Sequence, residues 1–269
     1  MSFKRILTTV IGLPIVVAIL ILGNKYIIDF IMMGTAIICM YEYFSVIQKV
    51  AHPIKLVGYL STIIIALIAF IPTEIVMQVI LYAIPIIVLL LFLKVIITNM
   101  ETTFKDVAYT FLGIFYITFF IMFLSFIRGL ENGNFILIYV FLMAWSTDIF
   151  AYLIGKNFGK HFFSKISPKK TIEGCVSGIV GAVIVGIIYA FVINQFLNIE
   201  ISSYIMIAVI SLVLSVISQV GDFVASSIKR FVDLKDYGDL IPGHGGMLDR
   251  IDSLIFIAPF AYMFFSLMI

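Results

Sequence analysis

Long apolar runs recur through the whole chain, and they limit its fold more than any other feature. A transmembrane helix needs about 20 predominantly apolar residues, because the hydrocarbon core of a bilayer is about 30 Å thick. Runs of about this length occur at residues 6–22, 27–47, 57–71, 75–97, 107–127, 135–154, 175–197, 204–228 and 251–269. They predict an all-α polytopic membrane protein with about nine transmembrane helices, and the short third run leaves eight or ten spans open.

Composition excludes a water-soluble globule. Hydrophobic residues make up 63% of the 269 residues and charged residues only 12%, and the mean hydropathy is +1.21. A soluble domain of this size would have to hide more apolar surface than it can bury. Cys39 and Cys175 lie in separate apolar runs without the spacing of metal ligands, so a disulfide framework is not expected.

The distribution of Lys and Arg predicts the orientation in the membrane. We interpret the first run as a retained helix rather than a cleaved signal peptide, because no small-residue cleavage site precedes Asn24. Cytoplasmic loops carry an excess of Lys and Arg. With the N-terminus inside, only Lys25 and Arg128 of the 17 basic residues fall outside. We therefore expect a cytoplasmic N-terminus and an outside C-terminus.

The longest polar segment spans residues 226–252 and combines glycines, one histidine and charges of both signs. Its cations are Lys229, Arg230, Lys235 and Arg250, and its acids are Asp233, Asp236, Asp239, Asp249 and Asp252. Magnesium takes oxygen ligands from carboxylates and substrate phosphates, and the amides of a glycine-rich turn can approach phosphate closely. The segment predicts a phosphate-and-metal site, although composition alone also fits a solvated loop.

The order of residues in this segment resembles the signature of the phosphatidate cytidylyltransferases, also called CDP-diacylglycerol synthases. The matching positions are Ser227, Lys229-Arg230, Lys235-Asp236, Pro242, His244-Gly245-Gly246 and Asp249-Arg250-Ile251-Asp252. A second similar block holds Trp145, Asp148, Ala151-Tyr152, Gly155-Lys156, Gly159-Lys160, Ser167-Pro168-Lys169-Lys170-Thr171 and Glu173-Gly174. Before residue 145 the likeness is limited to apolar, helical character.

The resemblance implies transfer of the cytidylyl group of CTP to phosphatidic acid, with Mg²⁺ as cofactor and a second cation left open. It implies a metal site of Asp222, Asp249 and Asp252, phosphate contacts from Lys229 and Arg230, and a catalytic His244 that acts as an acid or only as a hydrogen-bond donor. The remaining residues expected to bind substrate are Asp148, Lys169, Lys170, Ser226, Ser227, Lys235, Gly245, Gly246 and Arg250. It also implies a homodimer.

Two acids lie inside apolar runs rather than between them. Asp148 and Asp222 each precede a loop cation by eight residues, which places them about 12 Å below the cytoplasmic loops. Such carboxylates are costly and often functional, but a structural hydrogen-bonded pair, or a packing stripe of Trp145, Asp148 and Tyr152, remains open. Asp249 and Asp252 share one helix face. Glu42 is either a pathway residue or a structural acid with its hydrogen bonds satisfied.

The basic loop at residues 155–173 has two interpretations. Lys160 and Lys165 are typical of an anchor at the cytoplasmic face, whereas Lys169 and Lys170 lie in the family-like block and are expected to bind phosphate. The helix that follows carries a stripe of small residues that permits close helix packing, within the bundle or in a dimer. This stripe consists of Gly174, Gly178, Ala182, Gly186 and Ala190.

We expect one integrated membrane domain, in which residues 1–134 have a weakly defined role and residues 135–269 carry the catalytic loops. Its expected place is the bacterial cell membrane, with the active site on the cytoplasmic side, lipid as a partner and no nucleic acid. Two other functions stay open. A CTP-dependent polyprenol or lipid kinase would transfer the γ-phosphate, and an ion or proton transporter would use the intramembrane acids without a nucleotide; the inverted halves frequent in transporters are not apparent.

Overall fold

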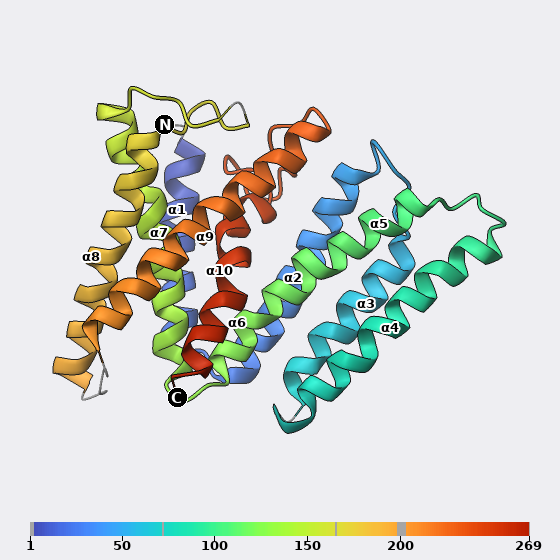
Figure 1. Ribbon diagram of the computed structural model, residues 1–269, viewed down its shortest axis with the longest axis horizontal. Helices are drawn as coiled ribbons and strands as arrows, with labels where there is room; N and C mark the ends of the chain where they lie inside the picture. The colour runs from blue at the N-terminus through green and yellow to red at the C-terminus, as the bar shows by residue number, and fades with distance from the viewer. Residues whose placement is uncertain (1–2, 72, 165, 198–202, 269) are drawn as a thin grey trace. The chain divides into compact units, whose positions relative to one another are not determined.

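The computed structural model describes residues 3–71, 73–164, 166–197 and 203–268, and helices dominate it (Figure 1). The helices are α1 (Phe3–Leu22), α2 (Lys25–Ile47), α3 (Lys55–Leu67), η1 (Ile68–Phe70), α4 (Thr73–Ile97), α5 (Phe104–Gly113), η2 (Ile114–Phe119), α6 (Phe120–Arg128), α7 (Gly133–Phe158), α8 (Ile172–Leu197), α9 (Tyr204–Phe231) and α10 (Leu248–Ser266). Within these ranges the only β pairing is two isolated antiparallel bridges, Phe162 with Thr171 and Ile241 with Gly245.

Each apolar run falls on a helix, which confirms an all-helical membrane protein. Among the described residues, six helices are long and apolar enough to cross a bilayer: Lys25–Ile47, Gln78–Ile97, Phe104–Arg128, Gly133–Phe158, Ile172–Phe196 and Tyr204–Phe231. The apolar helices Val10–Leu22 and Lys55–Phe70 are shorter, and the first five residues of α10 include three charged ones. Nine spans and the orientation of the termini therefore stay predictions. Lys165 lies outside the described residues.

The chain divides into two compact units. The first unit contains Met1–Gly129 and Phe231–Ile251, and the second contains Leu130–Arg230 and Asp252–Ile269. The helix α10 begins in the first unit and continues in the second. The division predicted at residues 134 and 135 stays a prediction.

The first unit is built around α2. Gly58 of α3 and Gly113 of α5 have no side chain because the rings of Phe44 and Tyr43 on α2 occupy that space. The hydroxyl of Tyr43 donates to the carbonyl oxygen of Tyr109 at 3.0 Å. Aromatic side chains on one helix thus pack directly against the backbone of two neighbours, so small residues at these two points allow a close approach.

The second unit is built around the pair α7 and α8, which lie side by side (Figure 1). A Cβ atom on Gly174 or Gly178 would meet the carbonyl oxygen of Ala151 or Thr147, at 2.8 Å in each case, and Gly186 faces Ser211 of α9. The stripe of small residues on α8 therefore serves packing within the bundle. The structure contains one chain, so the homodimer stays a prediction.

Hydrogen bonds between helices reinforce this bundle. The hydroxyls of Tyr139 and Ser211 are 2.7 Å apart, and Thr147 donates to Ser215 at 2.8 Å. These polar groups lie inside apolar helices and are buried, where an unpaired hydroxyl would cost free energy. They fix how α9 lies against α7, and α9 carries Asp222 further along its length.

Candidate active site

A charged pocket of about 520 Å³ lies in the second unit, between α7, α8, α9 and the loop that joins α7 to α8. Asp148 and Asp222 line it together with Lys169 and Lys170. The sequence placed both acids inside helices at a similar depth, and the structure brings them to one cavity. The ammonium of Lys170 forms an ion pair with the carboxylate of Asp222 and lies over the ring of Phe223, 4.6 Å from its centroid.

Asp252 lies on α10, and its side chain is buried. The carboxylates of Asp222 and Asp148 and the ammonium of Lys229 are close enough to interact with it electrostatically. Its Oδ1 atom accepts a hydrogen bond from the backbone N–H of Ser253 at 2.8 Å. Gly221 permits the close approach of α9 and α10, because a Cβ atom there would be 2.8 Å from the carbonyl oxygen of Asp252.

Local contacts hold the basic loop in place. The hydroxyl of Thr171 accepts from the backbone N–H of Gly174 at 3.1 Å, which caps the start of α8. The bridge between Phe162 and Thr171 closes the loop, and the N–H of Phe163 donates to the carbonyl oxygen of Lys170 at 3.0 Å. Lys170 is thus fixed at its backbone, while Lys169 beside it is exposed.

The glycines of this block have a packing role. A Cβ atom on Gly159 would be 2.6 Å from Thr171, and one on Gly155 would be 3.4 Å from the Cα atom of Gly174. These glycines let the end of α7 lie against the start of α8. The family-like spacing of Gly155, Gly159 and Gly174 is therefore explained by the close contact of two helices around Thr171.

The first unit holds the glycine-rich turn. Gly243 and Gly245 have φ angles of +79° and +85°, which favour glycine. The N–H of Ile241 donates to the carbonyl oxygen of Gly245 at 2.9 Å, and the N–H of His244 donates to that of Ile241 at 2.8 Å. His244 is thus carried on a tight, internally bonded turn, and its role stays open.

Asp249 organises the backbone around this turn. Its Oδ2 atom accepts from the N–H of Tyr237 at 2.8 Å and from that of Gly246 at 3.0 Å. The side chain is buried. The two hydrogen bonds orient the carboxylate at the first turn of α10 and join Tyr237 and Gly246 of the preceding loop to it.

Glu42 of α2 holds the start of α10. Its Oε1 and Oε2 atoms accept from the N–H groups of Met247 and Leu248, each at 2.8 Å. A Cβ atom on Gly246 would be 2.6 Å from Oε2, so Glu42 also explains this glycine. Of the two interpretations of Glu42, these contacts favour the structural acid. Its bonding partners lie 205 and 206 residues away, where no local pattern reveals them.

The remaining predicted residues are spread over both units. In the second unit Ser226 is half-buried, Arg230 is exposed and Lys229 is buried, while the hydroxyl of Ser227 donates to the carbonyl oxygen of Val224 at 2.7 Å. In the first unit Lys235 and Arg250 are exposed. Lys229 is the cation of this set that interacts with a buried acid, Asp252.

A buried acid on α2, in the first unit, was not predicted. Asp29 of α2 is fully buried and interacts electrostatically with Lys25 and Arg128. These two cations also donate to the carbonyl oxygens of Ala69 and Gly23, at 3.0 Å and 2.9 Å. The sequence did contain a signal for this interaction, because Asp29 follows Lys25 by four residues and both therefore lie on one face of the helix.

The acids of the second unit have the chemistry that a hard cation needs. Asp252 is buried beside two other carboxylates, and carboxylate oxygens are the ligands that magnesium prefers. Asp249, the third residue of the predicted set, lies three residues earlier on α10 and in the other unit. In the described ranges, no group of three or more His, Cys, Asp or Glu side chains meets the geometry of a metal site. Magnesium binding stays a prediction.

Comparison with known proteins identifies the family. The model of the cytidylyltransferase family matches residues 3–268. The chain belongs to the cytidylyltransferase family. Phosphatidate cytidylyltransferases from Bacillus subtilis, Thermotoga maritima and Staphylococcus aureus are 39%, 36% and 38% identical over 182, 167 and 158 residues, which are 67%, 61% and 58% of this chain. The matched segments span 66%, 61% and 58% of those relatives. The resemblance found in the sequence is confirmed.

Proposed function

We propose that this protein transfers the cytidylyl group of CTP to phosphatidic acid, giving CDP-diacylglycerol and pyrophosphate. The observation that carries the proposal is the pocket in which Lys170 pairs with Asp222 beside the buried Asp252, in a chain of the cytidylyltransferase family. Charged side chains of both signs in one cavity suit two polyanionic substrates, because cations bind phosphate and carboxylates bind the metal ions that accompany a triphosphate.

The reaction requires little proton chemistry from the protein. The phosphate of phosphatidic acid is already an anionic nucleophile, so its oxygen attacks the α-phosphorus of CTP without a general base. The bond between the α-phosphorus and its bridging oxygen to the β-phosphate breaks, and pyrophosphate leaves with the electron pair. Catalysis then depends on alignment and on stabilising negative charge in the transition state.

Seven charged residues and His244 have roles in this scheme. Lys170 and Lys229 hold phosphate oxygens from positions that the acids fix, and Lys169 and Arg230 attract the anionic substrates from the exposed surface. Asp222, Asp249 and Asp252 would hold magnesium, which neutralises the triphosphate when bound. The N–H groups that bind Asp249 orient its carboxylate. His244 donates to a phosphate or protonates the leaving pyrophosphate.

The location of the site follows from the distribution of charge. Lys169, Lys170, Lys229 and Arg230 lie in segments predicted to face the cytoplasm, where CTP is available. The lipid substrate would arrive from within the membrane and the nucleotide from water. We therefore propose an integral protein of the bacterial cell membrane that works at its cytoplasmic face.

The test is turnover by the purified protein. Incubation with CTP labelled in the cytosine ring, phosphatidic acid and Mg²⁺ should transfer the label to CDP-diacylglycerol, with one pyrophosphate released per lipid. A lipid kinase would instead transfer the unlabelled γ-phosphate to the lipid and leave the cytosine label in the released CDP. Absence of CDP-diacylglycerol above background in several detergents would overturn the proposal.

A further inference from the structure

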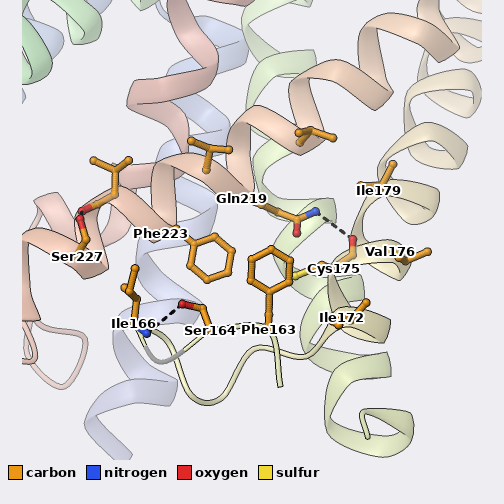
Figure 2. A pocket seen from close by; sticks show the side chains of 13 residues that line it. Phe163, Ser164, Ile166, Ile172, Cys175, Val176, Ile179, Gln219, Phe223 and Ser227 are labelled. Carbon is orange, nitrogen blue, oxygen red and sulfur yellow. Dashed lines mark hydrogen bonds between the residues drawn. The ribbon is translucent and has the colours of Figure 1, made fainter. Parts of the chain in front are cut away.

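An apolar groove lies in the second unit, next to the charged pocket. Its volume is about 550 Å³, and its walls come from α8, from α9 and from the loop before α8. Figure 2 shows Ile172, Val176 and Ile179 along one wall and the rings of Phe163 and Phe223 facing each other. These rings are stacked, with centroids 4.9 Å apart. Apart from Ser164, Gln219, Ser227 and the thiol of Cys175, the lining side chains are hydrocarbon.

The groove and the charged pocket share a wall. Cys175 and Gln219 line both cavities, and the Nε2 atom of Gln219 donates to the carbonyl oxygen of Cys175 at 3.0 Å (Figure 2). Phe223 links them a second time, because its ring lines the groove and also lies under the ammonium of Lys170. A molecule that fills both cavities needs a charged end, for which the lysines of the pocket suit a phosphate, and a hydrocarbon end for the groove.

We infer that the groove binds an acyl chain of the phosphatidate substrate while the charged pocket binds its phosphate. This inference rests on the proposed function. CTP does not suit the groove, because its base, ribose and phosphates would leave polar groups unpaired against hydrocarbon side chains. In a lipid phosphate, the short glycerol backbone joins the phosphate to its acyl chains, so one molecule can reach both sides of the wall at Cys175 and Gln219.

The physical setting predicts what the groove contributes. An acyl chain that leaves the bilayer exchanges one apolar environment for another, so the hydrophobic effect gives little gain and the fit of the chain decides the affinity. The groove should therefore select for the length of the acyl chain. The affinity for a phosphatidate whose chains are too short to reach past Cys175 should not depend on the shape of the groove.

Val176 and Val180 provide a matched pair of variants. Both are valines on α8, one helical turn apart, with 55% and 53% of their surface exposed. Val176 lines the groove, whereas Val180 does not. Val176→Trp should fill the groove, and Val180→Trp places the same bulk on the neighbouring surface. Val220→Trp fills the groove from α9 and serves if the first variant does not fold.

The experiment measures binding before turnover. The melting temperature of each purified protein is titrated without CTP against dioleoyl phosphatidate, dihexanoyl phosphatidate and dioleoyl phosphatidylcholine. We expect Val176→Trp and Val220→Trp to weaken binding of dioleoyl phosphatidate by about tenfold, or ~1.4 kcal/mol. Binding of dihexanoyl phosphatidate should change by less than about twofold, or ~0.4 kcal/mol. The Val180→Trp protein should bind all three lipids as the unmodified protein does.

Turnover separates this inference from the proposed function. With CTP and Mg²⁺, kcat/KM for dioleoyl phosphatidate should fall in the two groove variants relative to dihexanoyl phosphatidate, while KM for CTP stays constant. Equal effects of Val176→Trp and Val180→Trp would overturn the inference. An equal loss of phosphatidylcholine binding would also overturn the inference, because the groove would then bind bilayer lipids whatever their headgroup. Unmodified protein that makes no CDP-diacylglycerol refutes the proposed function, and the titration still decides what the groove binds.

Discussion

In the first unit, Glu42, Asp106 and Asp249 accept hydrogen bonds from backbone N–H groups 12 or more residues away in the chain. In the second unit, Asp222 and Asp252 lie among charged side chains, and the backbone N–H that donates to Asp252 is that of the adjacent Ser253. All of these acids except Asp222 are buried. An acid that accepts from the backbone has a fixed orientation and holds a loop. One that interacts with lysines and other acids can exchange these partners for a substrate or a cation.

This difference indicates that the two units have different roles. The first fastens the glycine-rich turn to α2 and to the start of α10, and the second presents charge inside a cavity. Substitutions in the first unit should therefore alter stability and activity together. Substitutions in the second unit should alter activity more than stability. Neighbouring carboxylates repel each other when no cation neutralises them, so removing one of them costs the fold little.

The largest effect is expected from neutralising the acids of the second unit. Asp222→Asn and Asp252→Asn should each lower the rate of CDP-diacylglycerol formation by about two to three orders of magnitude, the usual effect of removing a group that stabilises transition-state charge. Thermal stability should be kept, because each change also relieves repulsion between carboxylates. Initial rates over a range of Mg²⁺ concentrations, with melting temperatures in parallel, measure both effects.

Asp233→Asn and Asp239→Asn are the controls, since both residues are exposed acids in the loop between α9 and α10. Their rates should stay within about twofold of the unmodified protein, because exposed charges contribute little. Near-normal rates for Asp222→Asn, or rates that fall only as stability falls, would make the acids of the second unit structural and remove the contrast with the first.

The next effect concerns the two neighbouring lysines. Lys170→Gln should lower kcat/KM about thirtyfold, because a hydrogen bond to a charged group contributes ~2 kcal/mol. Lys169→Gln should lower it about threefold, since an exposed cation is screened by water and salt. Both proteins should unfold at the temperature of the unmodified one. Equal losses would mean that the pairing with Asp222 is irrelevant, and unchanged kinetics of the double variant would leave both lysines as membrane anchors.

A smaller effect on rate is expected at Glu42. Glu42→Gln keeps the size of the side chain but offers one acceptor oxygen to two N–H groups, so the free energy of unfolding should fall by about 1–3 kcal/mol. The Mg²⁺ concentration for half-maximal rate should rise a few-fold, because the turn next to Asp249 is less firmly held.

Asp106→Asn is the matched control for Glu42. Asp106 accepts from the N–H groups of Thr103 and His52, at 2.8 Å and 2.6 Å, in the same unit. The free energy of unfolding should fall by a similar amount, and the Mg²⁺ dependence should not change. The same shift in Mg²⁺ dependence for both variants would show that it reports general loosening of the first unit.

The sequence predicted the helices well because length and apolarity alone specify a membrane helix. It also predicted that Asp148, Lys170 and Asp222 matter, from intramembrane depth and from the family pattern, and the structure brings them to one pocket. The hydrogen-bond partners of Glu42 were not predictable, since they are residues far away in the chain. Nor was the stacking of Phe163 on Phe223, because a loop and a helix meet there without any periodic signal.

The smallest effect is expected at an exposed ion pair beside Lys170. The Nδ1 atom of His161 lies 2.6 Å from Oε1 of Glu173, and 74% of the histidine side chain is exposed. Exposed pairs contribute little, because water screens the charges and two side chains must be ordered to form the pair. His161→Ala should leave the melting temperature and the rate unchanged within error, at low and at high salt.

Glu173→Gln tests the other partner of this pair. The Oε2 atom of Glu173 also accepts from the backbone N–H of His161 at 3.3 Å, and the amide oxygen of glutamine can still accept there. This variant should therefore match His161→Ala in rate and stability. A loss of rate as large as that of Lys170→Gln in either variant would mean that the geometry of the basic loop depends on this pair. The ion pair between Lys170 and Asp222 would then no longer explain why their pocket is sensitive to substitution.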